Sequence, residues 1–242
     1  MSFLVIDKIT KRYKGNDFLS LDDVSLEVYE GEVLSLLGVN GSGKTTLSSI
    51  IATLLRPSSG DVLFRGRSVY EDVGGFRGKL GYCPQKPNLN PLLTVEENLY
   101  FDAIYYGVDA AAALKKVEEF LEKFELKKYR KFEVDKLSGG YKQRVMIARA
   151  LMHDAEIIIL DEPTVALDPS VRRSLWDMIK KLKKTVLLTT HYLDEADYLS
   201  DRVCVLDKGK IMLIDTPQNL KNKHNDASLE NIFIELTKKE EE

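Results

Sequence analysis

The sequence predicts an α/β fold, a mainly parallel sheet with helices, into which an α-helical subdomain is inserted. Two observations lead to this fold class. Short apolar runs typical of strands occur together with helical patterns near both ends of the chain, as in α/β proteins. From about Pro87 to Met152, helical periodicity replaces the strand pattern. The expected parts are an α/β core at 1–86 and 153–216, a helical subdomain at 87–152 and a C-terminal tail at 217–242.

Alternating and continuous apolar runs predict the individual strands. In the segment 21–30, Val24, Leu26 and Val28 alternate and therefore share one face. The short run 32–38 ends in glycine and leads into a helical pattern, which is the strand–turn–helix unit of nucleotide-binding folds. The other strand segments are 3–10, 61–66 (an expected edge strand), 156–163, 185–191, 202–209 and 210–215.

Two helical segments, 93–107 and 111–126, fall within the predicted helical subdomain. An apolar stripe at helical spacing in the second segment is expected to form the core of this subdomain. The stripe comprises Leu114, Val117, Leu121 and Phe124. The tail combines a polar link, a short amphipathic segment and a charged end.

The composition limits the classes of function. The 242 residues are 44% hydrophobic, enough for one sizeable core, and the net charge of −3 gives no electrostatic case for nucleic acid. Cys83 and Cys204 lie far apart in apolar stretches, so we expect buried free thiols in a reducing compartment. No apolar run approaches the roughly 18 residues of a membrane-spanning helix, and no signal-peptide pattern occurs. We expect a soluble cytoplasmic protein that works at a membrane only through another polypeptide.

A glycine-rich loop between the strand at 32–38 and the next helix predicts a phosphate-binding site. The segment GVNGSGKT, Gly38–Thr45, fits the pattern G-x-x-x-x-G-K-[ST] in the strand–loop–helix context that this pattern requires. We expect its N–H groups to cradle phosphates, Lys44 to reach the β- and γ-phosphate oxygens, and Thr45 to ligate Mg²⁺. The candidate ATP-binding residues here are Gly38, Asn40, Gly41, Ser42, Gly43, Lys44, Thr45 and Thr46.

Candidate catalytic groups follow other apolar runs. Asp161 and Glu162 end the run IIILDEP, and neighbouring strand residues point to opposite sides, so the two carboxylates are expected to have different roles. Asp161 suits the Mg²⁺ shell, and Glu162 suits a general base that acts on water. His191 follows the strand TVLLTT, at the carboxyl edge where α/β sheets bind ligands, and Gln85 ends the turn GYCPQ. Taken singly, His191 and Gln85 are also compatible with a structural role.

A second anion-binding pattern occurs far from the first in the chain. The segment LSGGYKQR, 137–144, leads from Ser138, Gly139 and Gly140 into a helical pattern. A helix N-terminus with glycines presents free N–H groups and the positive end of the helix dipole. A domain that binds one nucleotide does not need both sites, so the residues alone leave the purpose of the second one open.

The order of these segments resembles that of the ATP-binding subunits of ABC transporters, over nearly the whole chain. In that family's terms, the motifs are Walker A (Gly38–Thr45), the Q-loop (Gln85), the signature (Leu137–Arg144), Walker B with its glutamate (Asp161, Glu162), the D-loop (Ala166–Asp168) and the H-loop (His191). The resemblance implies a P-loop nucleotide triphosphatase core with an additional antiparallel β subdomain. It also implies that Gln85 senses Mg²⁺ and the attacking water. His191 would contact the γ-phosphate and orient Glu162, and Tyr13 would stack on adenine.

The resemblance also implies partners. Two copies, or this chain and a second ATPase subunit, would pack head to tail. The signature residues Ser138, Gly139 and Gly140 of one would then close over the γ-phosphate bound by Lys44 of the other. A transmembrane permease would hold this dimer at the cytoplasmic face of the membrane, where hydrolysis of Mg-ATP drives transport. The segments LGYCPQKPNLNPLLTVEENL, LSGGYKQRV and SLENIFIEL are similar to ABC-2-type exporters, which include drug-resistance exporters, and imply export.

Two positions depart from the family's commonest pattern. Tyr141 replaces the usual glutamine of the signature, and Ala166 replaces a frequent glycine next to Asp168 in the D-loop. Neither change removes a phosphate ligand, so the resemblance still implies active hydrolysis. The alternative is a cytosolic ABC ATPase without a transporter, such as a translation factor or a DNA-repair ATPase. The translation factors usually carry two nucleotide domains in one chain, and the repair ATPases insert a long coiled coil between Walker A and the signature. A metabolic P-loop kinase would not explain LSGGYKQR.

Overall fold

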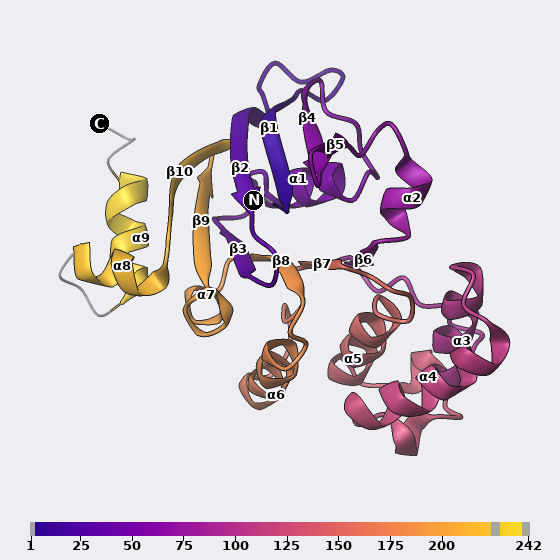
Figure 1. Cartoon of the computed structure of the whole chain (residues 1–242). Coiled ribbons are helices and arrows are strands. Elements are labelled where there is room, and N and C mark those ends of the chain that lie inside the picture. The colour runs from indigo at the N-terminus through magenta and orange to yellow at the C-terminus, as the bar shows by residue number, and fades with distance from the viewer. Residues whose placement is uncertain (1–2, 224–227, 239–242) are drawn as a thin grey trace. The chain divides into compact units, whose positions relative to one another are not determined.

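The structure, a computed structural model, describes residues 3–223 and 228–238, and the chain divides into two compact units. Unit 1 comprises Met1–Phe76 with Lys184–Glu242, and unit 2 comprises Arg77–Lys183. Figure 1 shows the elements of both units with their labels. No helix in the described part of the chain is both long enough and apolar enough to cross a membrane. The division into core, helical subdomain and tail that we expected from the sequence stays a prediction.

Unit 1 contains a four-stranded antiparallel sheet in the order β2-β1-β4-β5. Its strands are β1 (Leu4–Lys11), β2 (Leu21–Val28), β4 (Ser59–Phe64) and β5 (Arg67–Ser68). Val24, Leu26 and Val28 are all buried, which confirms the face predicted from their alternation. The prediction of an edge strand at 61–66 is wrong, because the short β5 pairs with the outer side of β4. This sheet is the antiparallel β subdomain that the resemblance implied.

A second set of strands in unit 1 has the order β10-β9-β3-β8. Its strands are β3 (Val33–Leu37), β8 (Thr185–Thr190), β9 (Arg202–Asp207) and β10 (Lys210–Asp215). β3 is parallel to both β8 and β9, whereas β10 pairs antiparallel with β9. β8 is buried along its whole length and β3 along nearly all of it. Continuous apolar runs of this kind are typical of parallel strands that are covered on both faces.

The helices of unit 1 include the C-terminal one. They are α1 (Lys44–Ile51), α7 (Leu193–Leu199), α8 (Pro217–Lys223) and α9 (Leu229–Lys238). α7, α8 and α9 share one buried apolar cluster with β3 and β9. Its buried members are Leu37, Ala196, Val203, Val205, Leu220, Leu229 and Ile232. The C-terminal helix is therefore part of the apolar core of unit 1.

Unit 2 combines two parallel strands with several helices. The strands are β6 (Leu80–Cys83) and β7 (Ile157–Asp161), and the helices are α3 (Val95–Tyr105), α4 (Ala110–Lys123), α5 (Gly139–Arg149) and α6 (Pro169–Lys180). The short α2 (Val73–Arg77) lies where the chain enters this unit. α3 begins with a capping box, in which the Thr94 hydroxyl accepts from the backbone N–H of Glu97 and the Glu97 carboxylate accepts from that of Thr94.

The apolar stripe predicted for α4 is largely correct. Val117, Leu121 and Phe124 are buried, whereas Leu114 is 56% exposed, so its assignment to the core is wrong. Ala113 takes the buried position instead, because it lies four residues before Val117 on the same face of the helix.

Both cysteines are buried free thiols, as predicted. Cys83 ends β6, and Cys204 lies inside β9. Burial raises the pKa of each thiol to about 12. Both side chains are therefore protonated at neutral pH and act as small apolar groups of the core.

Candidate functional site

The phosphate loop at 38–45 joins β3 to α1, and its surroundings require two of its glycines. A Cβ atom on Gly38 would lie 2.2 Å from the carbonyl oxygen of Leu206. Gly43 has a φ of 110°, and a Cβ atom there would lie 2.7 Å from the carbonyl oxygen of Ser20. Glycine is the residue that fits both positions without displacing the neighbouring backbone. The loop is therefore packed tightly against unit 1 on its inner side.

The polar groups of this loop suit an anion. Lys44 is buried, and its Nζ donates to the carbonyl oxygens of Gly38 at 2.8 Å and Val39 at 3.0 Å. The Ser42 hydroxyl is buried and has no hydrogen-bond partner among the described residues. α1 begins after Gly43 without a side-chain cap, so no cap occupies its first N–H groups. A cation, an unpaired hydroxyl and helix N–H groups in one loop match the oxygens of a phosphate.

Tyr13 lies beside the phosphate loop. Its hydroxyl is 3.3 Å from that of Thr46 in the first turn of α1, and the two groups share a hydrogen bond. The ammonium group of Lys11 lies 5.5 Å from the centre of the Tyr13 ring. The ring is 39% exposed. The structure thus brings a partly exposed aromatic ring to the start of α1, where the exposed Thr45 also lies.

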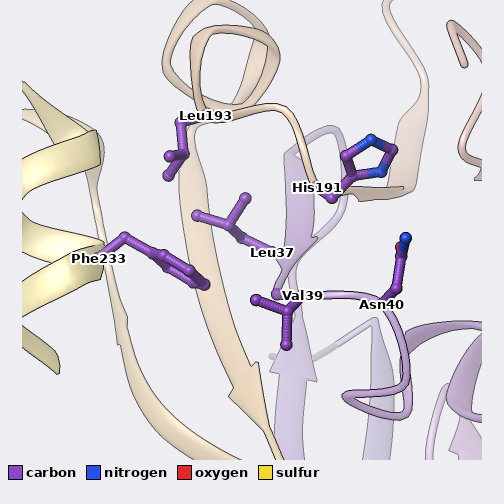
Figure 2. Close-up of a pocket in the computed structure, with 7 residues that line it drawn as sticks. Leu37, Val39, Asn40, His191, Leu193 and Phe233 are labelled. Atoms are coloured by element: carbon purple, nitrogen blue, oxygen red, sulfur yellow. The ribbon is translucent and has the colours of Figure 1, made fainter. Parts of the chain in front are cut away.

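His191 reaches the same loop because β3 and β8 are parallel. Leu37 pairs with Thr190 at the carboxyl ends of these strands, so Gly38 and His191 are the next residue of each segment. Both line a pocket of about 320 Å³, together with Asn40. In Figure 2 the ring of His191 and the side chain of Asn40 lie on the same side of this pocket. The histidine selected from the sequence therefore lies next to the phosphate loop.

In unit 2, the parallel pairing of β6 with β7 brings Gln85 to Glu162. Cys83 pairs with Leu160, and each polar residue lies two positions beyond its strand partner. Gln85 Nε2 donates to Glu162 Oε2 at 2.9 Å. Glu162 is nearly buried, directly follows the buried Asp161 and has a φ of 48°. A non-glycine residue in the left-handed region is strained, and such strain is concentrated at functional sites.

The signature segment forms the start of α5. Ser138 is the N-cap residue of this helix, yet its side chain makes no capping hydrogen bond. A Cβ atom on Gly140 would lie 2.4 Å from Val171 Cγ1, so packing inside unit 2 requires this glycine. A Cβ atom on the exposed Gly139 would lie 3.5 Å from Leu167 Cδ2, which is an ordinary contact. Gly139 is therefore not required by its own unit.

Tyr141 packs in a cluster of aromatic and cationic side chains. Its ring centre lies 4.2 Å from that of Tyr129. The Lys128 ammonium group lies 4.8 Å from the ring centre of Tyr129 and 5.5 Å from that of Tyr141, and the Arg144 guanidinium lies 5.4 Å from the latter. A hydrogen bond with Lys128 lowers the pKa of Tyr129. Tyr141 therefore ties the signature helix to the 3₁₀ turn at 127–129.

The D-loop connects β7 to α6 and contains another strained residue. Ala166 has a φ of 58°, in the region that favours glycine. Asp168 is the N-cap residue of α6, and its side chain makes no capping hydrogen bond. Asp168 thus resembles Ser138: each is the N-cap residue of a helix, and neither side chain makes a capping hydrogen bond to that helix.

The structure brings most of the sequence-predicted residues together within each unit. Unit 1 groups Tyr13, the phosphate loop and His191, and unit 2 groups Gln85 with Glu162. Sequence reasoning missed Leu193 and Phe233, which line the pocket beside His191. The signal that could have found Phe233 is the amphipathic pattern of the tail. The loop between a buried strand and a helix, with a histidine after the neighbouring parallel strand, defines a fold of the P-loop nucleotide triphosphatase class.

Known proteins share this fold and sequence. The sequence profile described as ABC transporter matches residues 21–165. The chain is 40% identical to ATP-binding cassette sub-family A member 2 of Rattus norvegicus over 224 residues. The aligned residues make up 92% of this chain and 9% of that protein. The chain is also 38% identical to the doxorubicin resistance ATP-binding protein DrrA of Mycobacterium tuberculosis over 230 residues. The aligned residues make up 94% of this chain and 70% of that protein.

A solved structure extends the comparison. The ATP-binding cassette MJ0796, in a dimeric structure of a post-hydrolysis state bound to ADP and Pi, superposes with a TM-score of 0.81 at 32% identity. The match covers 88% of this chain and 98% of that one. The chain belongs to the ABC transporter family. The resemblance and the fold class predicted from the sequence are confirmed.

Replacing Ala166 by glycine is expected to raise the free energy of unfolding by up to about 1 kcal/mol, because the left-handed backbone strains alanine but not glycine. Denaturant titration of both proteins measures the change. The matched control is Ala111→Gly in the first turn of α4, where the backbone is helical and the side chain is exposed, so glycine should lower stability by up to about 1 kcal/mol. Equal losses in the two variants would contradict strain at Ala166.

Proposed function

We propose that this chain hydrolyses Mg-ATP in a head-to-tail dimer and thereby drives export of a substrate through a separate transmembrane permease. The observation that carries the proposal is the 2.9 Å hydrogen bond between Gln85 Nε2 and Glu162 Oε2. It holds a strained and nearly buried carboxylate at the end of a buried strand. A buried carboxylate that a neighbouring amide holds in one direction is suited to act on a water, which supports a functional role for Glu162.

The phosphate loop binds the triphosphate of ATP. Lys44 exchanges its bonds to loop carbonyl oxygens for bonds to the β- and γ-phosphate oxygens, and the Ser42 hydroxyl gains an acceptor. Gly38, Asn40, Gly41 and Gly43 contribute the loop backbone, and Thr46 approaches the α-phosphate. Tyr13 stacks on adenine, next to the Thr46 hydroxyl that already holds it. Binding of ATP thus gives Lys44 a charged partner in place of neutral carbonyl oxygens and gives the Ser42 hydroxyl a hydrogen-bond acceptor.

Mg²⁺ suits the oxygen atoms that these segments offer. The hydroxyl of Thr45, the amide oxygen of Gln85 and the carboxylate of Asp161 are the hard donors that Mg²⁺ prefers. Gln85 uses its Nε2 atom for Glu162, and its amide oxygen is therefore the atom that serves the metal. When bound, Mg²⁺ neutralises charge on the β- and γ-phosphates.

Glu162 is the general base of the hydrolysis. Its carboxylate accepts a proton from water as the water oxygen attacks the γ-phosphorus and the bond to the β–γ bridging oxygen breaks. The hydrogen bond from Gln85 orients this carboxylate. His191 contacts the γ-phosphate from its position beside the phosphate loop.

The signature supports a dimer. Ser138 does not cap its own helix, and Gly139 is not required by packing within its own unit. Both features are expected when Ser138, Gly139 and Gly140 of one subunit bind the γ-phosphate held by Lys44 of the other. Asp168 in the D-loop also makes no capping bond and faces the second subunit in this arrangement. The second subunit is a copy of this chain or a related ATPase.

Export is supported by the relative that is named for drug resistance. DrrA is a doxorubicin resistance ATP-binding protein, and 94% of this chain aligns with it. A permease holds the dimer at the cytoplasmic face of the membrane and provides the path of the substrate. Co-purification of the chain with a membrane protein from its own cells tests this part of the proposal.

The variant Glu162→Gln is expected to bind ATP and to lose turnover, because the amide keeps the shape of the carboxylate but cannot accept the proton. At saturating Mg-ATP it should form a stable dimer, which light scattering detects as a doubled mass. The control is the double variant Lys44→Ala/Glu162→Gln, which should stay monomeric. A monomeric Glu162→Gln protein at saturating Mg-ATP would contradict a site shared between two copies of this chain.

Gly139→Ala, introduced into the Glu162→Gln background, tests whether glycine at this position is needed for the dimer and not for the fold of the chain itself. The added methyl group has room inside unit 2, so thermal stability should not fall, whereas the ATP-dependent dimer should weaken by about tenfold or more, or roughly 1.4 kcal/mol. Gly140→Ala is the matched control, because it meets Val171 and should destabilise its own unit. Undiminished dimerisation of the Gly139→Ala protein would refute the role of Gly139 in the second subunit's site.

Tyr13→Ala is expected to weaken ATP binding by roughly 1–3 kcal/mol, the scale of base stacking on aromatic side chains. Calorimetry with a non-hydrolysable ATP analogue measures the loss. Tyr13→Phe is the control, since it keeps the ring and removes the hydrogen bond to Thr46. If Tyr13→Ala binds the analogue as tightly as Tyr13→Phe does, the ring does not stack on adenine.

A further inference from the structure

We propose that Gly209, in the turn between β9 and β10, is a positioning residue that directs the Gly43 N–H group of the phosphate loop toward the phosphates of the nucleotide. The inference rests on the proposed binding of ATP by this loop. Its basis is a hydrogen bond in which the Gly209 N–H donates to the Ser42 carbonyl oxygen at 3.0 Å. Gly209 belongs to none of the motifs found in the sequence.

This hydrogen bond fixes one peptide group of the phosphate loop. The peptide groups on either side are bonded within the loop and its helix. The Ser42 N–H donates to the Val39 carbonyl oxygen at 3.2 Å, and the Gly43 carbonyl oxygen accepts from α1 at 2.9 Å. The Ser42 carbonyl between them is bonded to the turn. Because a trans peptide group is planar, its C=O and N–H point in opposite directions, so the Gly43 N–H points away from Gly209.

The side of the loop that faces away from the turn is the side open to a ligand. On the turn side, a Cβ atom on Gly38 would lie 2.2 Å from the Leu206 carbonyl oxygen. One on Gly43 would lie 2.7 Å from the Ser20 carbonyl oxygen. A phosphate has no room between groups packed this closely, whereas Asn40 at the tip of the loop is exposed. The Gly43 N–H, just before α1, therefore points to the side from which a phosphate approaches.

The turn is itself held in place by the start of β2. The Gly209 carbonyl oxygen accepts from the Asp22 N–H at 2.9 Å, and the Lys210 ammonium group lies 3.2 Å from the Asp22 carboxylate. A Cβ atom on Gly209 would lie 2.8 Å from the Ser20 carbonyl oxygen, so any side chain at this position displaces the turn. A displaced turn also moves its N–H group relative to Ser42.

A second hairpin in unit 1 separates what such a turn needs from what the phosphate loop needs. Two-residue turns join β4 to β5 and β9 to β10, and both residues of each turn have a positive φ, which favours glycine. The second residue is Gly66 in one turn, with a φ of 78°, and Gly209 in the other, with a φ of 79°. Gly66 is exposed, and an added Cβ would meet nothing within 4 Å, whereas Gly209 is buried. Contact with other segments therefore distinguishes Gly209 from Gly66.

The test compares Gly209→Ala with the matched control Gly66→Ala in the full chain. Alanine strains the same backbone conformation in both turns, but it meets another segment only at position 209. We expect Gly209→Ala to weaken the binding of ADP about tenfold, the loss expected for one hydrogen bond to a charged group. Gly66→Ala should bind ADP as the wild type does. Calorimetry below the unfolding temperature of both variants measures the two Kd values, and equal values would overturn the proposal.

A second pair of variants covers the case in which Gly209→Ala does not fold. Asparagine tolerates the left-handed backbone better than alanine, but it also carries a Cβ atom. Gly209→Asn and its control Gly66→Asn therefore repeat the comparison with less backbone strain. The same difference in ADP affinity is expected, and its absence would contradict the role of Gly209.

The amide N–H resonance of Gly43 tests the orientation directly and needs no turnover. In the nucleotide-free protein it should shift in Gly209→Ala and stay unchanged in Gly66→Ala. Addition of ADP to the wild type should move it to lower field, as the N–H bonds to a phosphate oxygen, and should move it less in Gly209→Ala. A wild type that does not bind ADP would refute the proposed function. An unshifted Gly43 resonance in nucleotide-free Gly209→Ala would refute the role of Gly209.

Discussion

The register of the parallel strands is the constraint on which the candidate site depends. In unit 1, the pairing of Leu37 with Thr190 makes the phosphate loop and His191 leave the strands at the same edge. In unit 2, the pairing of Cys83 with Leu160 does the same for Gln85 and Glu162. Because β3, β7 and β8 are buried on both faces, a slip of one residue would bring a flanking polar residue into the core at one end of a strand, so burial of the apolar runs enforces the register. Packing of apolar side chains thus places polar groups that are distant in sequence.

Internal packing explains why some residues of the site are present, and it does not explain others. Gly38 and Gly140 each face an atom that a Cβ would meet at far less than contact distance, so internal packing explains them. The buried Ser42 hydroxyl has no partner among the described residues, and leaving such a group unsatisfied costs about 1–3 kcal/mol. The groups that internal packing does not explain are those expected to meet a ligand.

The sequence predicted the local features of the protein well and the long-range ones poorly. The phosphate loop, the strand positions and the candidate role of Glu162 follow from short patterns in which each residue's neighbours in sequence carry the information. The hydrogen bond between Gln85 and Glu162 and the contact of Tyr141 with Tyr129 depend on strand register and helix packing, which one sequence does not reveal. Helix α6 was not predicted from the sequence, although a local signal for its start was available. Asp168 and Pro169 are a typical N-cap and first residue of a helix.

The segment after β7 combines deep burial at its start with backbone strain at two of its residues. Glu162 and Ala166 both have a positive φ, and neither is glycine. Glycine at 166 would remove the strain but would also widen the range of conformations open to the segment, since glycine has the largest backbone freedom. Alanine therefore lowers the stability of this segment and restricts its motion at the same time. In the proposed mechanism Glu162 is the general base and must keep its direction toward the attacking water, and a stiff, strained segment meets that requirement better than a relaxed and mobile one.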